Sequence, residues 1–181
     1  PMQALTAALD AAATRWPDEP SLRDFRIAPD AVQAELDALQ AAHTIVTPHH
    51  AVAQWARAHL RAQVQLVPWQ YPALKQKKLA AGPANSPMLV MLCSTLPRKG
   101  SRELAAALHA LQPTHPLRLG VLGSLPQAPS AALQTMWQAL APVALGYGSD
   151  WVAQASVAVL PAHVEHAPRA ALMALAAGIP V

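Results

Sequence analysis

Two groups of polar residues follow apolar, strand-like runs and could act on a ligand. Arg98 and Lys99 follow the run Met88–Cys93, and Glu165 follows the run Val157–Leu160. Fixed positive charge beside a helix N-terminus favours an anion such as a diphosphate, which it binds and stabilises as a leaving group. A carboxylate accepts hydrogen bonds from hydroxyl groups. These residues therefore predict a site for a ligand that carries both an anionic group and hydroxyls.

Each of these residues also has a simpler interpretation. Arg98 and Lys99 fit a solvated basic turn, and Glu165 fits an acid stabilised by the dipole of the helix that Pro168 begins. Gly123 follows an apolar run and fits an ordinary left-handed turn as well as a ligand-binding loop. The residues alone leave these alternatives open.

The elements that must position these residues alternate between strands and helices. Short apolar or β-branched runs predict strands, and capped alanine- and leucine-rich runs predict helices. The predicted elements are strand Met88–Cys93, loop Ser94–Gly100, helix Ser101–Leu111, strand Leu117–Leu122, helix Ala131–Leu140, strand Val143–Leu145, short helix Asp150–Ala155, strand Ser156–Leu160, helix Ala170–Ala177 with Gly178 as C-cap, and the opening of a further strand at Ile179–Val181. This alternation predicts an α/β fold, a Rossmann-like parallel sheet flanked by helices, with right-handed crossovers. Ligands of such sheets bind at the carboxyl ends of the strands, so Lys99 and Glu165 are expected to face the same crevice.

The first part of the chain predicts a smaller set of elements. They are helix Met2–Arg15, the irregular stretch Trp16–Pro29, a helix N-capped by Asp30 with Gln33 completing a capping box, strand His43–Thr47, helix His49–Leu60 and strand Val64–Val67. Gln70–Ser86 holds prolines, a glycine and three lysines without a long apolar run, which is typical of an exposed linker. The chain begins with Pro1 and stops within an apparent strand, so it is expected to be a fragment of a longer protein.

The last stretch of the chain resembles a motif of a known family. Leu160-Pro161, Glu165 and the run Ala174–Val181 resemble the donor-binding motif of retaining GT-B glycosyltransferases, which reads strand, Pro, loop, Glu, seven residues, Glu-Ala-x-Ala-x-Gly-x-Pro-Val. In that family the first acid contacts the donor sugar and the second holds the nucleotide ribose. Met173 stands at the position of the second acid, so the chain keeps one of the two carboxylates.

Two further stretches are similar to the same family. Lys99-Gly100 matches the end of its Gly-Arg-Leu-x-x-x-Lys-Gly motif, whose Arg and Lys hold the donor diphosphate. Ser94 stands at the position of that Arg, and Arg98 is expected to substitute for it. The acidic helix after Asp30, the run Ala41–Pro48, the next helix and Val67-Pro68-Trp69 together look like the end of the family's N-terminal domain, in which His43 and His49 replace the more common Asp and Ser.

The resemblance implies domains and a set of site residues. It implies the end of an N-terminal, acceptor-side Rossmann-like domain at 1–69, a linker at 70–86 and a truncated C-terminal, donor-binding Rossmann-like domain at 87–181. Lys99 and Glu165 are the expected catalytic residues. The expected donor-binding residues are Ser94, Arg98, Lys99, Gly100, Gly123, Glu165, His166 and Arg169. No metal and no cofactor are expected, because the nucleotide sugar is the substrate.

The predicted function is transfer of a sugar from a nucleotide-sugar donor to an unknown acceptor, by a chain that is expected to be inactive as a fragment. The alternative is a catalytically impaired nucleotide-sugar binding or interaction module on the same scaffold, which Met173 and Ser94 allow. A sugar-nucleotide epimerase of the same architecture is a further option, but its usual acid and histidine motifs are not evident.

The composition narrows the classes of protein to which the chain could belong. Hydrophobic residues make up 53% of the chain and charged residues 13%, which is typical of a globular protein. The net charge is +3, but the only tight basic cluster is Lys75, Lys77 and Lys78, so nucleic acid is not an expected partner. The single cysteine, Cys93, excludes an internal disulfide and is expected to act as a small buried hydrophobe.

Neither a metal site nor a membrane span is expected from the sequence. His163, Glu165 and His166 could form a metal site, but no distant further ligand is indicated. No apolar run is long enough for a membrane span and no signal peptide is evident, so a cytoplasmic protein is expected, with association at a membrane surface left open.

Overall fold

The computed structural model describes residues 2–24, 26–69, 87–112, 114–123, 125, 130–163, 165 and 168–181. Contacts within the chain divide it into two compact units. The first unit contains Pro1–Thr6 and Arg26–Pro72, and the second contains Ala7–Phe25 and Ala73–Val181. Residues 7–25 thus group with the second unit, while the domain boundaries expected from the sequence stay a prediction. The expected linker Gln70–Ser86 lies outside the described residues.

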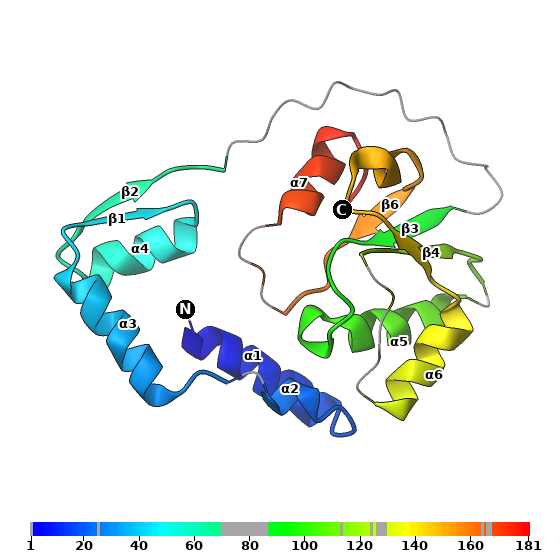
Figure 1. Cartoon of the computed structure of the whole chain (residues 1–181), viewed down its shortest axis with the longest axis horizontal. Coiled ribbons are helices and arrows are strands. Elements are labelled where there is room, and N and C mark those ends of the chain that lie inside the picture. Colours follow the sequence, from blue (N-terminus) through cyan, green and yellow to red (C-terminus); the bar gives the residue numbers. More distant parts are fainter. Residues whose placement is uncertain are drawn as a thin grey trace. The chain divides into compact units, whose positions relative to one another are not determined.

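The first unit is built on two parallel strands. Strands β1 (Thr44–Thr47) and β2 (Gln63–Leu66) pair in parallel, with Thr44 opposite Gln63, and helix α4 (His50–His59) connects them. Helix α3 (Pro29–Ala41) precedes β1 (Figure 1). A strand, a helix and a parallel strand form the βαβ unit that the sequence pattern predicts.

The predicted start of α3 is wrong in one detail. Ala28 is the N-cap residue and Pro29 opens the helix, so Asp30 lies inside its first turn, where its Oδ1 accepts a hydrogen bond from the Ala31 amide at 3.0 Å. Gln33 donates to Asp37 at 2.7 Å and closes no capping box. Proline is preferred in the first turn because it has no N–H to leave unsatisfied, which moves the helix start two residues upstream.

The second unit contains a four-stranded parallel sheet in the order β5-β4-β3-β6. Its strands are β3 (Met88–Met91), β4 (Arg118–Leu122), β5 (Val143–Leu145) and β6 (Val157–Val159). The connections contain helices α5 (Ser101–Leu111) and α6 (Ala131–Leu140) and the 3-10 helices η1 (Pro97–Lys99) and η2 (Ser149–Ala153). The chain runs from β3 through β4 to β5 and then returns to add β6 on the other side of β3 (Figure 1).

Side chains of the central strands alternate between two cores. Leu89 and Met91 of β3 belong to the core that α5 and α6 cover, together with Trp137. Val90 belongs to the opposite core, with Trp151. Burial on both faces is what an interior parallel strand requires, and it explains why these strands are continuous apolar runs. The α/β, Rossmann-like fold class predicted from the sequence is confirmed.

The chain ends with helix α7 (Arg169–Ala176), which packs on the core that contains Trp151. Gly178 has a left-handed backbone, with φ 76°, and this agrees with its predicted place at the end of the helix. Ile179–Val181 is not assigned as a strand, although the Pro180 carbonyl accepts a hydrogen bond from the Ala158 amide of β6 at 2.8 Å.

An N-terminal segment, Ala7–Asp24, completes the second unit. Helix α1 spans Met2–Arg15, and its buried side chains include Leu9. The stretch after it, predicted to be irregular, contains the short helix α2 (Ser21–Asp24), whose Leu22 is 1% exposed. Helix α2 contacts η1, which follows β3. The N-terminal segment therefore packs beside the loop that carries Lys99.

Among the helices of the described residues, none has the length and apolar character needed to cross a membrane.

Candidate functional site

The loops that carry Lys99 and Glu165 follow neighbouring strands. Lys99 lies after β3 and Glu165 after β6, and these strands pair in parallel, with Met91 opposite Val159. The next helices cover opposite faces of the sheet, α5 on one and α7 on the other. The strand order therefore reverses between β3 and β6, and ligands of doubly wound sheets bind outside the strand ends at this point.

Gly100 lets the two loops approach closely. It has φ 74°, and a Cβ atom built on it would overlap the carbonyl oxygen of Pro161 and lie 2.6 Å from the carbonyl carbon. A left-handed backbone already favours glycine, and the carbonyl leaves no room for a side chain. Gly100 also ends η1 and precedes α5, so it sets both the direction of the helix and its distance from the loop after β6.

Lys99 and Glu165 form an ion pair across these loops. Lys99 Nζ lies 2.9 Å from Glu165 Oε2, and their side chains are 19% and 20% exposed, respectively. The backbone of the lysine loop is fixed by hydrogen bonds from the Lys99 amide to Leu96 O and from the Gly100 amide to Pro97 O. The site therefore combines one cation, one carboxylate and the start of α5 within one part of the sheet edge.

Cys93 lies at the same edge and carries a protonated thiol. Its Sγ donates to the carbonyl oxygen of Lys99 at 3.5 Å. Burial raises the pKa of Cys93 to about 12, the Lys99 ammonium lowers it in part, and the Glu165 carboxylate raises it further. A thiol with such a pKa is not a nucleophile at neutral pH. Cys93 is thus a partly buried packing residue, close to the role expected from the sequence.

A second polar cluster adjoins the ion pair, and sequence reasoning missed it. Glu103 Oε1 accepts a hydrogen bond from Trp16 Nε1 at 3.0 Å and lies 3.2 Å from His163 Nε2. Arg102 stacks over the Trp16 ring at 4.9 Å and pairs with Asp18 at 2.8 Å. A charged pair at the start of α5 is typical of a solvated helix face, so no local signal in the sequence marked these residues as part of the site.

The buried side chain of Glu19 makes a further contact between the N-terminal segment and the rest of the second unit. Glu19 is 0% exposed, and its Oε1 accepts a hydrogen bond from the Ser130 hydroxyl at the start of α6. Ser130 in turn caps α6 by accepting from the Leu133 amide at 3.1 Å. This contact ties the N-terminal segment to a second helix of the sheet.

The other predicted donor-binding residues differ in how exposed they are and in which element they lie. Ser94 is exposed in the loop after β3, and Arg98 is half-buried in η1. Arg169 is exposed as the first residue of α7. His166 lies outside the described residues. Met173 packs against the core, so an apolar side chain stands where the family's second acid would be.

Gly123 follows β4 at the same edge of the sheet and has φ 94°. A Cβ atom there would overlap the hydroxyl oxygen of Tyr147, which follows β5, and lie 2.6 Å from the ring carbon that carries this hydroxyl. The left-handed backbone favours glycine at this position, whereas the Tyr147 side chain is 78% exposed and can turn away from an added methyl group.

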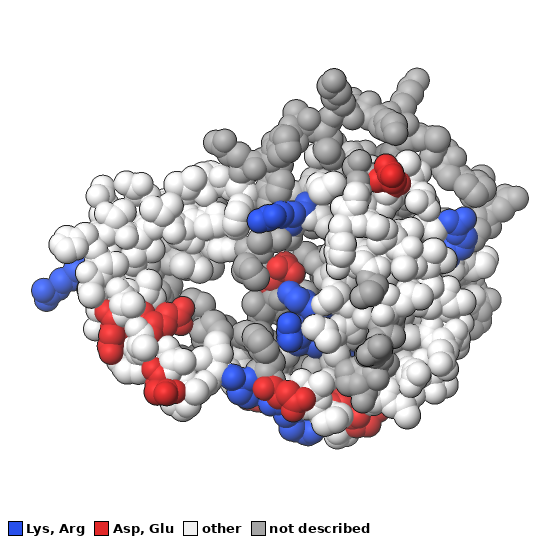
Figure 2. Space-filling view, viewed as in Figure 1, with Lys and Arg blue, Asp and Glu red and all other residues white. Residues whose placement is uncertain are grey.

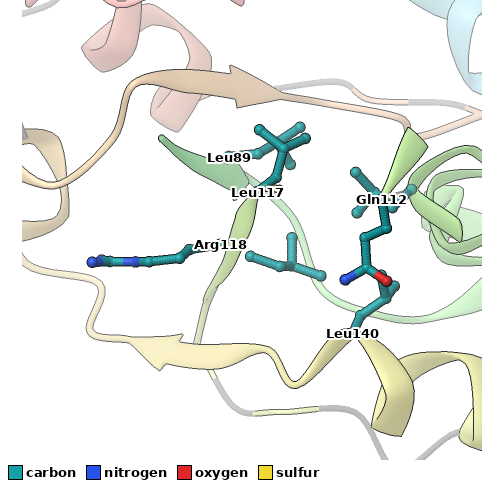
Figure 3. A pocket seen from close by; sticks show the side chains of 7 residues that line it. Leu89, Gln112, Leu117, Arg118 and Leu140 are labelled. Atoms are coloured by element: carbon teal, nitrogen blue, oxygen red, sulfur yellow. The ribbon is translucent and has the colours of Figure 1, made fainter. Parts of the chain in front are cut away.

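The structure also describes a small hollow at the opposite edge of the sheet (Figure 3). It lies where β3 and β4 begin and where α5 and α6 end, and Gln112 reaches it beside Leu140. The lining residues are Leu89, Leu108, Gln112, Leu117, Arg118, Leu119 and Leu140. This mainly apolar hollow is a packing defect between the sheet and its helices, and it is separate from the ion pair.

Charge is mixed over the face shown in Figure 2. Acidic side chains gather over α3, which carries Asp30, Glu35 and Asp37, and on the second unit acidic and basic side chains lie next to one another. A nucleic-acid site needs a continuous basic surface, and the described residues on this face form none. Within the described residues, no group of three or more His, Cys, Asp or Glu side chains is placed to hold a metal ion.

Fold and site together define a doubly wound α/β domain with an ion pair at the reversal of its strand order. No protein-family model matches this chain, and no curated protein matches it either.

Proposed function

We propose that this chain contains the donor-binding part of a glycosyltransferase that uses a nucleotide sugar. The observation that carries the proposal is the pairing of Lys99 with Glu165 at the strand-order reversal, 2.9 Å apart although 66 residues separate them. A nucleotide sugar has an anionic diphosphate directly joined to a hydroxyl-rich ring. A cation beside a carboxylate, next to a helix N-terminus, matches both parts of such a ligand.

The proposed roles divide between the two side chains. Lys99 binds the diphosphate and, together with the dipole of α5, stabilises the charge that develops on it when the bond to the sugar breaks. Glu165 accepts hydrogen bonds from the sugar hydroxyls. The ligand replaces the ion pair, because Lys99 exchanges the carboxylate for the diphosphate and Glu165 exchanges the ammonium for hydroxyl donors. The acceptor and the base of the donor are not assigned.

The resemblance to retaining GT-B glycosyltransferases supports this proposal at Lys99-Gly100, Glu165 and the run Ala174–Val181. One observation favours a second candidate, a nucleotide-sugar binding module without transfer activity. Met173 packs against the core and brings no carboxylate to the ribose position. Assays of donor hydrolysis and of transfer to acceptors distinguish the two candidates, because a module binds the donor and leaves it intact.

Calorimetry with a panel of nucleoside diphosphates and nucleotide sugars tests the proposal. Lys99→Ala is expected to weaken both ligand types by roughly ten- to a hundredfold, the cost of one charge-assisted contact. Glu165→Gln is expected to weaken the nucleotide sugar by a similar factor. It should leave the bare diphosphate unchanged or bound more tightly, because the carboxylate no longer compensates the Lys99 charge.

Two exposed residues provide matched controls. Arg118→Ala removes a cation at the amino edge of the same sheet, and Glu35→Gln changes an exposed acid of α3. Neither variant should change either affinity. Equal losses for both ligands in both site variants, or no loss in either, would falsify the division of roles.

A further inference from the structure

Two contacts join η1 and the start of α5 to the loop after β6. The first is the ion pair of Lys99 with Glu165. The second lies two residues earlier in the loop, where His163 Nε2 is 3.2 Å from Glu103 Oε1. The His163 side chain is 18% exposed and that of Glu103 is 26% exposed, so water screens the contact only in part. Glu103 therefore contacts the loop that carries Glu165.

Glu103 is also held from the opposite direction. Trp16 Nε1 donates to the same oxygen, Oε1, at 3.0 Å. The tryptophan ring lies under the Arg102 guanidinium, and Arg102 pairs with Asp18. Trp16 and Asp18 belong to the N-terminal segment, so Glu103 is a bridge between that segment and the loop after β6.

Two polar atoms of this bridge lack hydrogen-bond partners among the described residues. Glu103 Oε2 and His163 Nε2 are buried, and neither makes a hydrogen bond of good geometry with the described residues. The imidazole nitrogen lies 3.2 Å from Glu103 Oε1 without the alignment of a hydrogen bond. Buried polar atoms favour arrangements in which they are paired.

We propose that Glu103 is a positioning residue for the loop that carries Glu165, acting through His163 and itself held by Trp16. In this proposal Trp16 and Glu103 act on the loop rather than on the ligand. Their effect is to keep the loop in the place where Glu165 meets Lys99. What the loop binds rests on the proposed function, but the positioning role does not.

Backbone ¹⁵N relaxation of the full chain tests the positioning role. The amides of Ala162, His163 and Glu165 are expected to have order parameters of about 0.85 in the unaltered protein and below about 0.6 in Glu103→Ala. Trp16→Phe keeps an aromatic ring but loses the donor, so it should lower the same values. Glu103→Gln keeps an acceptor for Trp16 and should restore them.

The matched control is Glu35→Ala, which removes an exposed glutamate from α3 of the first unit and should change none of these values. Loop amides that are as ordered in Glu103→Ala as in this control would overturn the proposal. So would an equal loss of order in β4 in both Glu103→Ala and Trp16→Phe, because the contact would then only support the fold.

Ligand binding gives a second readout. Glu103→Ala should bind the nucleotide sugar roughly tenfold more weakly and keep its affinity for the bare nucleoside diphosphate, since only Glu165 is displaced. Glu103→Gln should restore the sugar-dependent part, and equal losses for both ligands would contradict the role. If the unaltered protein binds no nucleotide sugar, the proposed function fails, and the order parameters still decide the role of Glu103.

Discussion

Gly100 is the residue at which one added methyl group should most disturb the site. Its φ of 74° is unfavourable for other residues, and a Cβ atom would overlap the Pro161 carbonyl. Gly100→Ala is therefore expected to lower the free energy of unfolding by about 2–5 kcal/mol, the sum of a left-handed residue and an overpacked contact. Urea unfolding followed by tryptophan fluorescence measures this loss.

Substitutions at two other glycines distinguish the cost of the left-handed backbone from the cost of the overlap with Pro161. Gly178 has φ 76°, but no atom lies within 4 Å of the position that an added methyl group would take, so Gly178→Ala should cost only about 1–2 kcal/mol. Gly148 has φ −64° and the same open space, and Gly148→Ala should change stability by less than about 0.5 kcal/mol. Equal losses at Gly100 and Gly178 would show that the approach to Pro161 costs nothing.

The Cys93 thiol reports on the charges around it. Because burial raises its pKa to about 12, from a usual value of 9.0, alkylation by iodoacetamide at pH 8 should be at least about a hundredfold slower in the native chain than in urea. Lys99→Met should slow the native reaction further and Glu165→Gln should speed it, since the ammonium lowers the pKa of the thiol and the carboxylate raises it. The same direction of change in both variants would contradict this electrostatic picture.

The thiol also has a consequence for stability at high pH. The pKa of Cys93 is higher in the folded chain than in the unfolded chain, so its contribution is complete below about pH 9 and is lost as the pH rises towards 12. Cys93→Ser should remove this part of the decline in the free energy of unfolding between pH 9 and the highest pH that the chain tolerates. A decline of identical size in both proteins would mean that other groups cause it.

The sequence allowed part of this site to be predicted. Lys99 and Glu165 could be brought together because parallel strands end at one edge of a sheet, whatever their distance in sequence. Trp16 and Glu103 could not, because their contact depends on where a segment of the N-terminus packs. No periodicity or motif in either residue's own neighbourhood carries that information.

At the scale of elements, α2 is the clearest difference between expectation and structure. Pro17 and Pro20 are typical breakers of an irregular stretch, whereas Leu22 is 1% exposed in a short helix that contacts η1. The central strands β3 and β4 are easier to predict, because interior strands buried on both faces are almost entirely apolar. A four-residue helix has no such pattern, and its stability comes from its tertiary contacts.

A pair of leucine substitutions tests whether α2 is part of the second unit. Leu22→Ala should lower the free energy of unfolding of that unit by about 2–5 kcal/mol, because it empties a buried site. The control is Leu175→Ala in α7, which removes the same atoms from a side chain that is 57% exposed and should cost less than about 1 kcal/mol. Similar small effects of both substitutions would mean that α2 does not pack as described.

At the scale of the whole molecule, the two units share the chain in an interrupted order. The second unit takes Ala7–Phe25 from before the first unit and Ala73–Val181 from after it. The sequence predicts that trypsin cuts first at Lys75, Lys77 or Lys78, which lie outside the described residues. A cut there would leave the two pieces of the second unit on different fragments.

The two fragments are expected to stay together after this cut. The buried contacts of Leu22 and Glu19 hold the N-terminal segment on the second unit without a covalent link. Size-exclusion chromatography of the nicked protein should give one peak in buffer and two in urea. Two peaks in buffer would show that these contacts do not hold the pieces together.

The interrupted order also matters while the protein is being made. Glu19 and Ser130 are 111 residues apart, so at about 5–20 residues per second the ribosome needs roughly 6–20 s to supply the partner of Glu19 after Glu19 itself. During that interval the rest of the first unit, Arg26–Pro72, emerges, and the apolar side chains of Leu9 and Leu22 have no finished surface to cover them. The N-terminal segment is therefore the part of the nascent chain that chaperones should meet first and hold longest.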